Sequence, residues 1–223
     1  MEPSTQPSPT ATTLRALLSL LSFNHIATLL DFYQLIRQWW PSNTDMYEIL
    51  EYESTWEMLD IEGHLAIFRK RQRVKFLQNN IIAFEDYAWG DGDIFTDYKC
   101  APGVVVDRYR EGDRWNILIS LRGTKNKGDI EEFYIERTVT DGFRNTEEWQ
   151  QAEIRRRTRR LQMNVIFPNG RPCQKAELTQ RSHNRPITLG PEHFRRLADG
   201  RQLVTWETDK VRAYDIYTLK WQW

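Results

Sequence analysis

The stretch Glu48-Ile-Leu-Glu-Tyr-Glu-Ser-Thr-Trp-Glu-Met-Leu59 decides the fold, because its polarity alternates. A period of two places alternate side chains on opposite faces of a β-strand, one that packs and one that is wet. The next four residues, Asp60-Ile-Glu-Gly63, predict a turn in which Gly63 is free to adopt a positive φ. The stretch is therefore expected to form the first arm of a hairpin. Its packing positions are Tyr52, Ser54, Trp56 and Met58, and its polar positions are Glu51, Glu53, Thr55 and Glu57.

The return arm of this hairpin, residues 65–76, is rich in Arg and Lys. Opposite charges that face each other across a strand pair contribute about 0.2–1 kcal/mol each. A slip of one residue would turn every side chain to the wrong face, so such a ladder also fixes the register. We interpret the basic run at 69–75 as one side of an ion-pair ladder, with a nucleic-acid patch as the alternative. The predicted facing pairs are Glu51 with Arg73, Glu53 with Arg71, and Thr55 with Arg69.

In the rest of the chain, turn sequences separate short β-rich runs, as in an all-β domain. Consecutive β-rich runs without long intervening helices are typical of antiparallel hairpins. We expect residues 46–223 to form a mainly β domain, either an antiparallel β-sandwich or a distorted barrel of long hairpins. Turn dipeptides recur at Asp91-Gly92, Glu111-Gly112, Asp141-Gly142, Asn169-Gly170 and Asp199-Gly200. The β-rich runs are 81–89, 94–98, 104–109, 115–121, 130–139, 161–167, 176–179, 203–208 and 214–223.

Three local expectations refine this domain. Residues 146–152 have acids in what would be a first helical turn, which predicts a short helix. A second helical turn is expected within 190–197. The last run is expected to be an ordered strand, because large apolar rings on one face should not be left in water. The residues on that face are Tyr217, Leu219, Trp221 and Trp223.

The N-terminal region differs sharply from the β domain. Residues 1–13 are rich in Pro, Ser and Thr and predict a disordered tail. Residues 14–41 are apolar at helical spacing and predict an amphipathic helical segment that ends at Pro41. This segment is interpreted as covering its own domain or as docking onto a protein partner or a second copy. A transmembrane span is not expected, since Asp31 lies within the segment, and contact with a membrane surface is the least favoured role. The docking candidates are Leu17, Leu21, Leu29, Phe32, Ile36, Trp39 and Trp40.

Composition bounds the partners and the compartment. The 31 Lys and Arg residues equal the 31 Asp and Glu residues, so no whole-protein field would attract nucleic acid or an anionic membrane. Two cysteines cannot form a disulfide framework, and the chain starts without the features of a secretion signal. We therefore expect a cytoplasmic protein.

An acidic loop at residues 84–97 is a weak candidate for a metal site. Hard cations take carboxylate oxygens, and this loop offers several. The spacing is not that of an EF-hand, however, and Asp-Gly is also a common hairpin turn. A plain turn is the favoured interpretation. The candidate ligands are Asp91, Asp93 and Asp97.

An arginine run at residues 155–160 is the strongest basic cluster. Several guanidinium groups could neutralise phosphates and give salt-dependent binding. The favoured interpretation is cross-strand pairing with Glu131, Glu132 and Glu136, and an anion or nucleic-acid site is the alternative. The candidate residues are Arg155, Arg156, Arg157, Arg159 and Arg160.

Motifs of known catalytic mechanisms are absent from the sequence. It has no Gly-x-Ser-x-Gly elbow, no His-Glu-x-x-His and no phosphate loop. We therefore expect no catalytic residue, no cofactor-binding residue and no cofactor. The first hypothesis is a non-enzymatic protein-interaction module, such as an adaptor or accessory subunit. The alternatives are binding of nucleic acid or another polyanion through the arginine run, and a metal-dependent hydrolase at the acidic loop.

Overall fold

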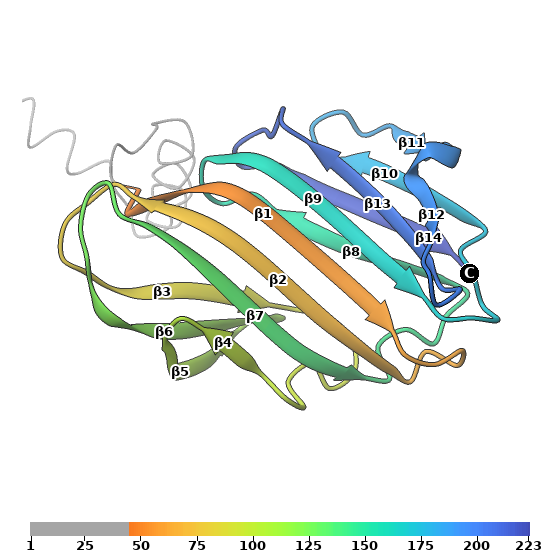
Figure 1. Cartoon of the computed structure of the whole chain (residues 1–223), viewed down its shortest axis with the longest axis horizontal. Coiled ribbons are helices and arrows are strands. Elements are labelled where there is room, and N and C mark those ends of the chain that lie inside the picture. Colours follow the sequence, from red (N-terminus) through yellow and green to blue (C-terminus); the bar gives the residue numbers. More distant parts are fainter. Residues whose placement is uncertain (1–44) are drawn as a thin grey trace, which may run out of the picture. The chain divides into compact units, whose positions relative to one another are not determined.

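The computed structural model describes residues 45–223, which are mainly β and contain three sheets rather than one closed barrel (Figure 1). The helical segment expected at 14–41, with its docking candidates, lies outside the described residues. The largest sheet has seven strands in the order β12 (Phe194–Arg196), β13 (Gln202–Thr208), β9 (Thr158–Phe167), β1 (Tyr47–Met58), β2 (Leu65–Phe76), β7 (Ile130–Thr140) and β4 (Lys99–Ala101).

Two smaller sheets complete the described part of the chain. The four-stranded sheet has the order β11 (Pro186–Thr188), β10 (Lys175–Gln180), β14 (Ile216–Gln222) and β8 (Glu147–Glu153). The three-stranded sheet has the order β3 (Ile81–Ala88), β6 (Arg114–Lys125) and β5 (Val104–Glu111). A 3₁₀ turn, η2 (Pro191–His193), directly precedes β12.

The predicted hairpin is confirmed in its strands, its turn and its register. β1 and β2 pair antiparallel, and Gly63 in the connecting turn has φ 75°. A residue with a Cβ would be strained there, because the added atom would lie 1.8 Å from the carbonyl oxygen of Phe143. The three predicted pairs are all observed: Glu51 with Arg73, Glu53 with Arg71, and Thr55 with Arg69.

Strand β1 also corrects the expectation of purely antiparallel hairpins. It pairs in parallel with β9, with Tyr52 opposite Leu161 and Trp56 opposite Val165. A parallel pair needs a long crossover connection, which the intervening strands β2 to β8 supply. The first hairpin thus lies in the middle of the large sheet and is bonded on both sides, which agrees with its role in organising the domain.

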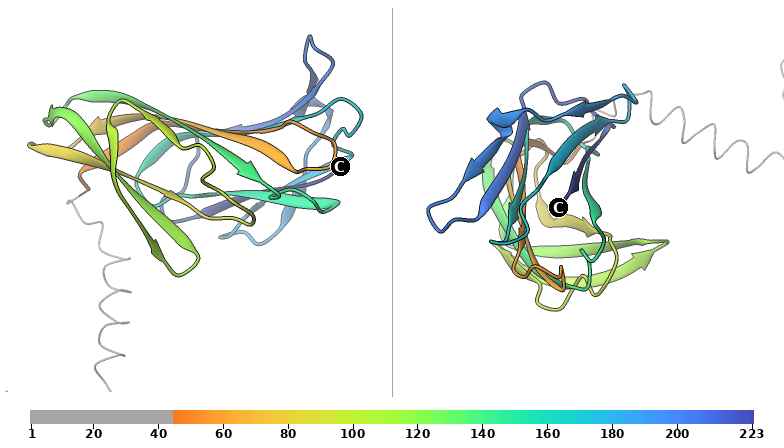
Figure 2. Two further views of the ribbon diagram at one scale, coloured as in Figure 1. Left: turned by 90° about the horizontal axis from the view of Figure 1, so that it is seen from below. Right: turned by 90° about the vertical axis from the view of Figure 1, so that its right-hand side faces the viewer.

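Aromatic residues join the sheets through a common core. Phe84 of β3 stacks on Phe133 of β7 with ring centroids 3.9 Å apart. Trp221 of β14 packs edge-on against Phe167 of β9 at 5.9 Å. Both small sheets therefore bury an apolar face against the large sheet, which curves around them (Figure 2). Burial of this area is the main stabilising term of the domain.

Local expectations are confirmed in part. The final strand places its rings inward as predicted, and Tyr217, Leu219, Trp221 and Trp223 are all buried. The helix expected at 146–152 is wrong: this segment is strand β8, which pairs with β14 along its whole length. The turn within 190–197 is a 3₁₀ turn followed by β12. The run at 94–98 is not a strand and holds only turns beside the Asp93–Thr140 bridge.

Candidate functional site

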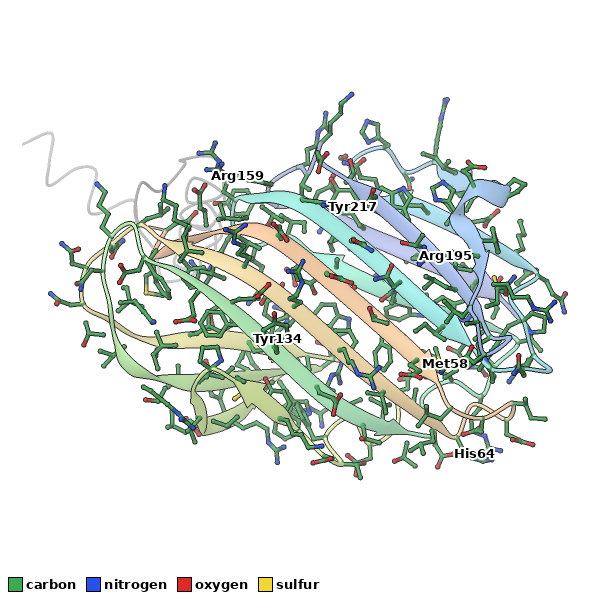
Figure 3. The ribbon with its side chains drawn as sticks, viewed as in Figure 1. Met58, His64, Tyr134, Arg159, Arg195 and Tyr217 are labelled. Carbon is green, nitrogen blue, oxygen red and sulfur yellow. The ribbon has the colours of Figure 1, made fainter. Side chains whose placement is uncertain are left out.

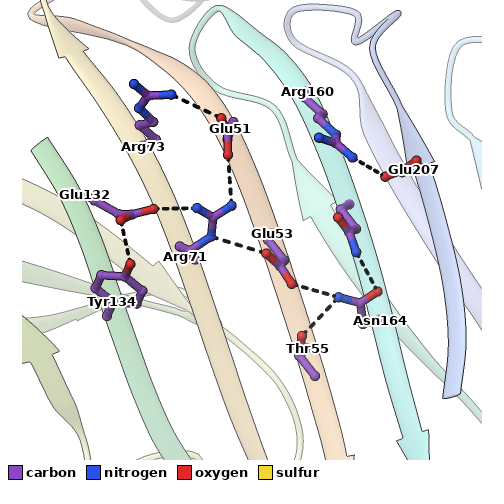
Figure 4. Close-up of polar contacts among 11 residues, drawn as sticks. Glu51, Glu53, Thr55, Arg71, Arg73, Glu132, Tyr134, Arg160, Asn164 and Glu207 are labelled. Atoms are coloured by element: carbon purple, nitrogen blue, oxygen red, sulfur yellow. Dashed lines mark hydrogen bonds and ion pairs between the residues drawn. The ribbon is translucent and has the colours of Figure 1, made fainter. Parts of the chain in front are cut away.

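The outer face of the large sheet carries the ladder that the sequence predicts, and its charges are paired (Figure 4). Arg71 donates to Glu51 at 2.9 Å and to Glu53 at 3.3 Å, and it also contacts Glu132 of β7. Asn164 of β9 continues the network by donating to Glu53 at 3.2 Å. Each guanidinium in this network already has carboxylate partners. We therefore interpret the ladder as a stabilising feature of the sheet and not as a phosphate-binding site.

The arginine run is paired as well, but with other partners than those predicted. Arg155 contacts Glu153 and Arg156 contacts Asp45, while Arg160 donates to Glu207 at 2.6 Å. Arg157 and Arg159 share the buried carboxylate of Glu48, at 3.7 and 2.7 Å (Arg159 is labelled in Figure 3). The predicted pairing with Glu131, Glu132 and Glu136 is wrong, since these acids pair with Lys125, Arg71 and Arg69.

The acidic loop does not gather its carboxylates. Asp93 accepts a hydrogen bond from the backbone N–H of Phe95 at 3.1 Å, and its own backbone bonds Thr140. Asp97 pairs with Lys99 at 2.8 Å. Asp91 instead lines a cavity. In residues 45–223, no cluster of three or more His, Cys, Asp and Glu side chains is placed to hold a metal ion.

Both cysteines are free thiols with different degrees of burial. Burial raises the pKa of the Cys173 thiol to about 12, and it also raises the pKa of the Cys100 thiol. An activated cysteine has the opposite shift, because the thiolate is the nucleophile. Neither thiol is therefore placed as a nucleophile.

This difference predicts selective labelling by a thiol reagent. At pH 8, Cys100 should react with DTNB at least about tenfold faster than Cys173, since only Cys100 is partly exposed. In a Cys100→Ser variant, the remaining reaction should follow unfolding in urea. Labelling of Cys173 in the folded Cys100→Ser variant at the rate of a free thiol would contradict the burial of this side chain.

Strand β5 is an edge of the three-stranded sheet, and it is exposed along its whole length. All eight residues from Val104 to Glu111 are exposed, including the apolar Val104, Val106 and Tyr109. In the described part of the chain, β5 pairs only with β6. The β5–β6 hairpin extends to one side of the domain (Figure 2, left). One row of backbone N–H and C=O groups is therefore available to a further strand.

Two arginines on β5 share one face of this edge. Arg108 lies opposite Ile117 and Arg110 lies opposite Trp115 in the β5–β6 register. Arg108 packs over the ring of Phe95 at 4.6 Å, and Arg110 donates to the backbone carbonyl of Gly112 at 2.9 Å. Among the described residues, neither guanidinium pairs with a carboxylate. This distinguishes them from the ladder and from the arginine run.

A second feature is a small, partly open cavity of about 80 Å³ with charged and aromatic walls. It lies against β2 and β7 of the large sheet and against residues of β3 and β8. Lys70 and Arg137 line it, and each is only 4% exposed. Asp86, which is 2% exposed, contacts Lys70 from outside this lining.

Sequence reasoning missed both the β5 edge and the cavity, although each left a signal. Three consecutive valines, 104–106, do not alternate with polar residues as a half-buried strand would. Lys70 stands at the same parity as Phe68 and Val74, so a charge falls on the packing face. The cluster could be suspected from parity, but the meeting of its members could not.

Comparison with known proteins adds little beyond these observations. No protein family model matches the chain, and no curated protein matches it. Among solved structures, it is similar to one from Parabacteroides distasonis described as "a putative protease", with TM-score 0.43, 10% identity and 80% of this chain covered. It is also similar to an M1 zinc metallopeptidase from Deinococcus radiodurans, with TM-score 0.47, 8% identity and 79% of this chain covered.

The chain spans less than half of either of these proteins, 40% of the first and 42% of the second. Within the described residues, no helix is long and apolar enough to cross a membrane.

Proposed function

We propose that this protein is a non-enzymatic interaction module, built as a β-sandwich, that binds an extended acidic segment of a partner protein along β5. The observation that carries the proposal is the exposure of every residue of β5, a strand that pairs on one side only within residues 45–223. An extended peptide that adds to such an edge gains main-chain hydrogen bonds, and its alternate side chains give specificity. In this proposal, the β5 edge is the surface through which the adaptor role expected from the sequence would be carried out.

The side chains of β5 favour a partner with alternating acidic and apolar residues. Arg108 and Arg110 share one face, so two carboxylates at alternate positions of an added strand would lie opposite them. Tyr109 projects on the other face and would meet an apolar residue between the two acids. Each such cross-strand pair contributes about 0.2–1 kcal/mol.

The same pattern disfavours a second copy of β5 as the added strand. In a two-fold antiparallel pairing, residues of the same face meet. A pairing centred on Arg108 brings this residue against its own copy. One centred on Tyr109 brings Arg108 against Arg110 and Asp107 against Glu111. Like charges directly opposite are destabilising, and the bulge between Val105 and Asp107 further distorts the edge.

A fluorescent peptide of four Glu-Val repeats tests the proposal on the full chain. We expect saturable binding that weakens as salt rises, with the Lys-Val peptide of equal length binding at least about tenfold less tightly. Charge reversal by Arg108→Glu with Arg110→Glu should weaken the Glu-Val peptide by at least about tenfold. The matched control reverses Arg195 and Arg196, two exposed arginines on the edge strand β12 (Arg195 is labelled in Figure 3), and should leave binding unchanged.

Methylation of alternate backbone nitrogens in the peptide separates strand addition from simple charge attraction. N-methyl groups remove donors on one edge of the peptide, so strand addition predicts a further loss of about tenfold or more for one of the two methylation registers. Equal affinity of the methylated and unmethylated peptides would overturn the proposal, as would equal losses from the β5 and β12 charge reversals.

Polyanion binding through the arginine run is the weaker alternative. Each of its five guanidinium groups contacts a carboxylate of the described chain, and Arg157 and Arg159 share one. Binding of a phosphate would have to displace these contacts. The unpaired arginines of β5 carry no such cost.

A further inference from the structure

The cavity beside β2 and β7 is lined by two buried cations, Lys70 and Arg137, which differ in their partners. Lys70 donates to Asp86, and Asp86 also accepts a hydrogen bond from the hydroxyl of Tyr98 at 2.7 Å. Among the described residues, Arg137 has no carboxylate in contact, and it donates to the backbone carbonyl of Ile94 at 3.2 Å. Lys70 is thus paired with a carboxylate, whereas Arg137 is not. Since an unpaired buried charge is costly, Arg137 favours an anion as its partner.

Unused donors of Arg137 are open to the cavity. A guanidinium carries five N–H donors, and within residues 45–223 Arg137 forms one hydrogen bond. The side-chain polar atoms of residues 45–223 that are both sealed from solvent and unpaired are Arg114 Nε and Trp221 Nε1. The remaining nitrogens of Arg137 are therefore not sealed off, and Arg137 lines the cavity.

Arg137 stays cationic at pH 7 although it is buried. Burial lowers the pKa of Arg137 to about 10, against the opposing effect of Asp86. Burial raises the pKa values of Tyr52 and Tyr87, so both phenols are neutral at pH 7. Two further acids, Asp91 and Glu148, line the same cavity. Neither is among the groups that shift the pKa of Arg137, and burial raises the pKa of Glu148.

The walls and the volume define the size and character of a ligand. Trp56 lies 5.3 Å and Phe68 lies 4.7 Å from the Arg137 guanidinium carbon, measured to the ring centroids. Other rings that line the cavity are those of Tyr52, Tyr87 and Phe143. A cavity of about 150 Å³ accommodates benzene, so a volume of about 80 Å³ suits a molecule of a few heavy atoms.

We propose that this cavity is a binding site for a small monocarboxylate of two or three carbons. The carboxylate accepts hydrogen bonds from the free N–H groups of Arg137, whose planar fork matches its two oxygens. The short alkyl group lies against the rings of Trp56 and Phe68. This site is separate from the β5 edge and does not rest on the proposed interaction function.

Carbon-13 NMR and calorimetry with acetate and propionate test the proposal on the full chain. We expect saturable binding of both ions in the millimolar range at constant ionic strength, measured against chloride. Propionamide has the shape of propionate without its charge and should bind at least about tenfold more weakly. Benzoate exceeds the cavity and should also bind at least about tenfold more weakly than propionate.

Variants locate the site. Arg137→Lys keeps the charge but loses the fork, and it should weaken propionate by about tenfold. Arg171→Met removes a partly exposed arginine that stacks on Trp223 at 3.8 Å, and it should leave propionate binding unchanged. Cross-relaxation between the propionate methyl group and the ring protons of Trp56 in the native protein supports the site even if Arg137→Lys folds poorly.

Three outcomes would overturn the proposal. They are the absence of saturable binding, equal binding of propionate and propionamide, and retained affinity in a folded Arg137→Lys protein. The charge reversal at Arg108 and Arg110 should leave propionate binding intact, so failure at one site is distinguishable from failure at the other.

Discussion

Replacing Asp86 with asparagine is expected to lower the free energy of unfolding by about 3–5 kcal/mol, the cost typical of breaking a buried ion pair by removing one partner. Asparagine keeps the size of the side chain and an acceptor for Tyr98. It removes the carboxylate that Lys70 contacts, while Lys70 and Arg137 stay buried. Lys70 would then be a buried cation without the carboxylate that it contacts now. Urea unfolding at pH 7 measures the change.

An exposed ion pair provides the control for this prediction. Glu207 accepts from Arg160 at 2.6 Å, and both side chains are about half exposed. Glu207→Gln should therefore cost less than about 1 kcal/mol. Adding Lys70→Met to Asp86→Asn should recover part of the lost stability, because it removes one orphaned cation. A cost for Asp86→Asn no larger than that for Glu207→Gln would show that the buried cluster is not coupled as its contacts indicate.

The first hairpin could be predicted closely from sequence because its information is local. Two arms joined by a short turn have few alternative registers, and the alternation of Glu51 and Glu53 against Arg71 and Arg73 selects one of them. The last strand was predictable for a similar reason, since its rings fall at one parity. Pattern and packing agree in both places.

Long-range pairing could not be read in this way. The parallel pairing of β1 with β9 joins segments that lie far apart in the chain. The residue pattern of neither strand indicates which strand it pairs with. The same limit applies to Arg157 and Arg159, whose partner is Glu48 rather than an acid of β7. Charge balance predicted that these arginines would be paired, but only the topology decides with which acids.

Strand β8 shows tertiary context overriding local propensity. Its acidic start resembles a first helical turn, yet Glu148, Gln150 and Ala152 alternate inward and are buried. Its pairing with β14 extends over seven positions. The gain from completing a sheet outweighs a helix signal that amounts to a few tenths of a kcal/mol per residue.

The cavity was beyond prediction because its charges come from separate strands. Lys70 lies on β2, Asp86 on β3 and Arg137 on β7, and each stands at an inward parity among apolar neighbours. When a charged residue stands at an inward position of a predicted strand, either the strand is assigned wrongly or the charge has a buried partner. Only the packing of the three-stranded sheet on the large sheet brings the three side chains together.

The same inter-sheet packing makes Trp221 the second residue at which a large effect is expected. Trp221→Ala should lower the free energy of unfolding by about 3–5 kcal/mol, the range for truncating a large buried aromatic side chain. Trp221 is 1% exposed and packs between Phe143 and Phe167, each with its ring centroid 5.9 Å away. Its removal would open a cavity where the four-stranded sheet meets the large sheet. Denaturation in urea with fluorescence and circular dichroism measures the loss.

Two further substitutions show whether this loss comes from packing. The indole N–H of Trp221 is buried without a hydrogen-bond partner, so Trp221→Phe removes an unsatisfied donor together with part of the ring. Trp221→Phe should lower the free energy of unfolding by less than about half as much as Trp221→Ala. The lost ring packing is destabilising, whereas removal of the unsatisfied donor is stabilising. Trp149→Ala on the neighbouring strand β8 removes a ring that is 45% exposed and should cost about 1 kcal/mol or less. Equal losses for Trp221→Ala and Trp149→Ala would mean that β14 does not anchor the four-stranded sheet. A loss confined to Trp221→Ala would place that anchor in the aromatic face that the sequence pattern predicts.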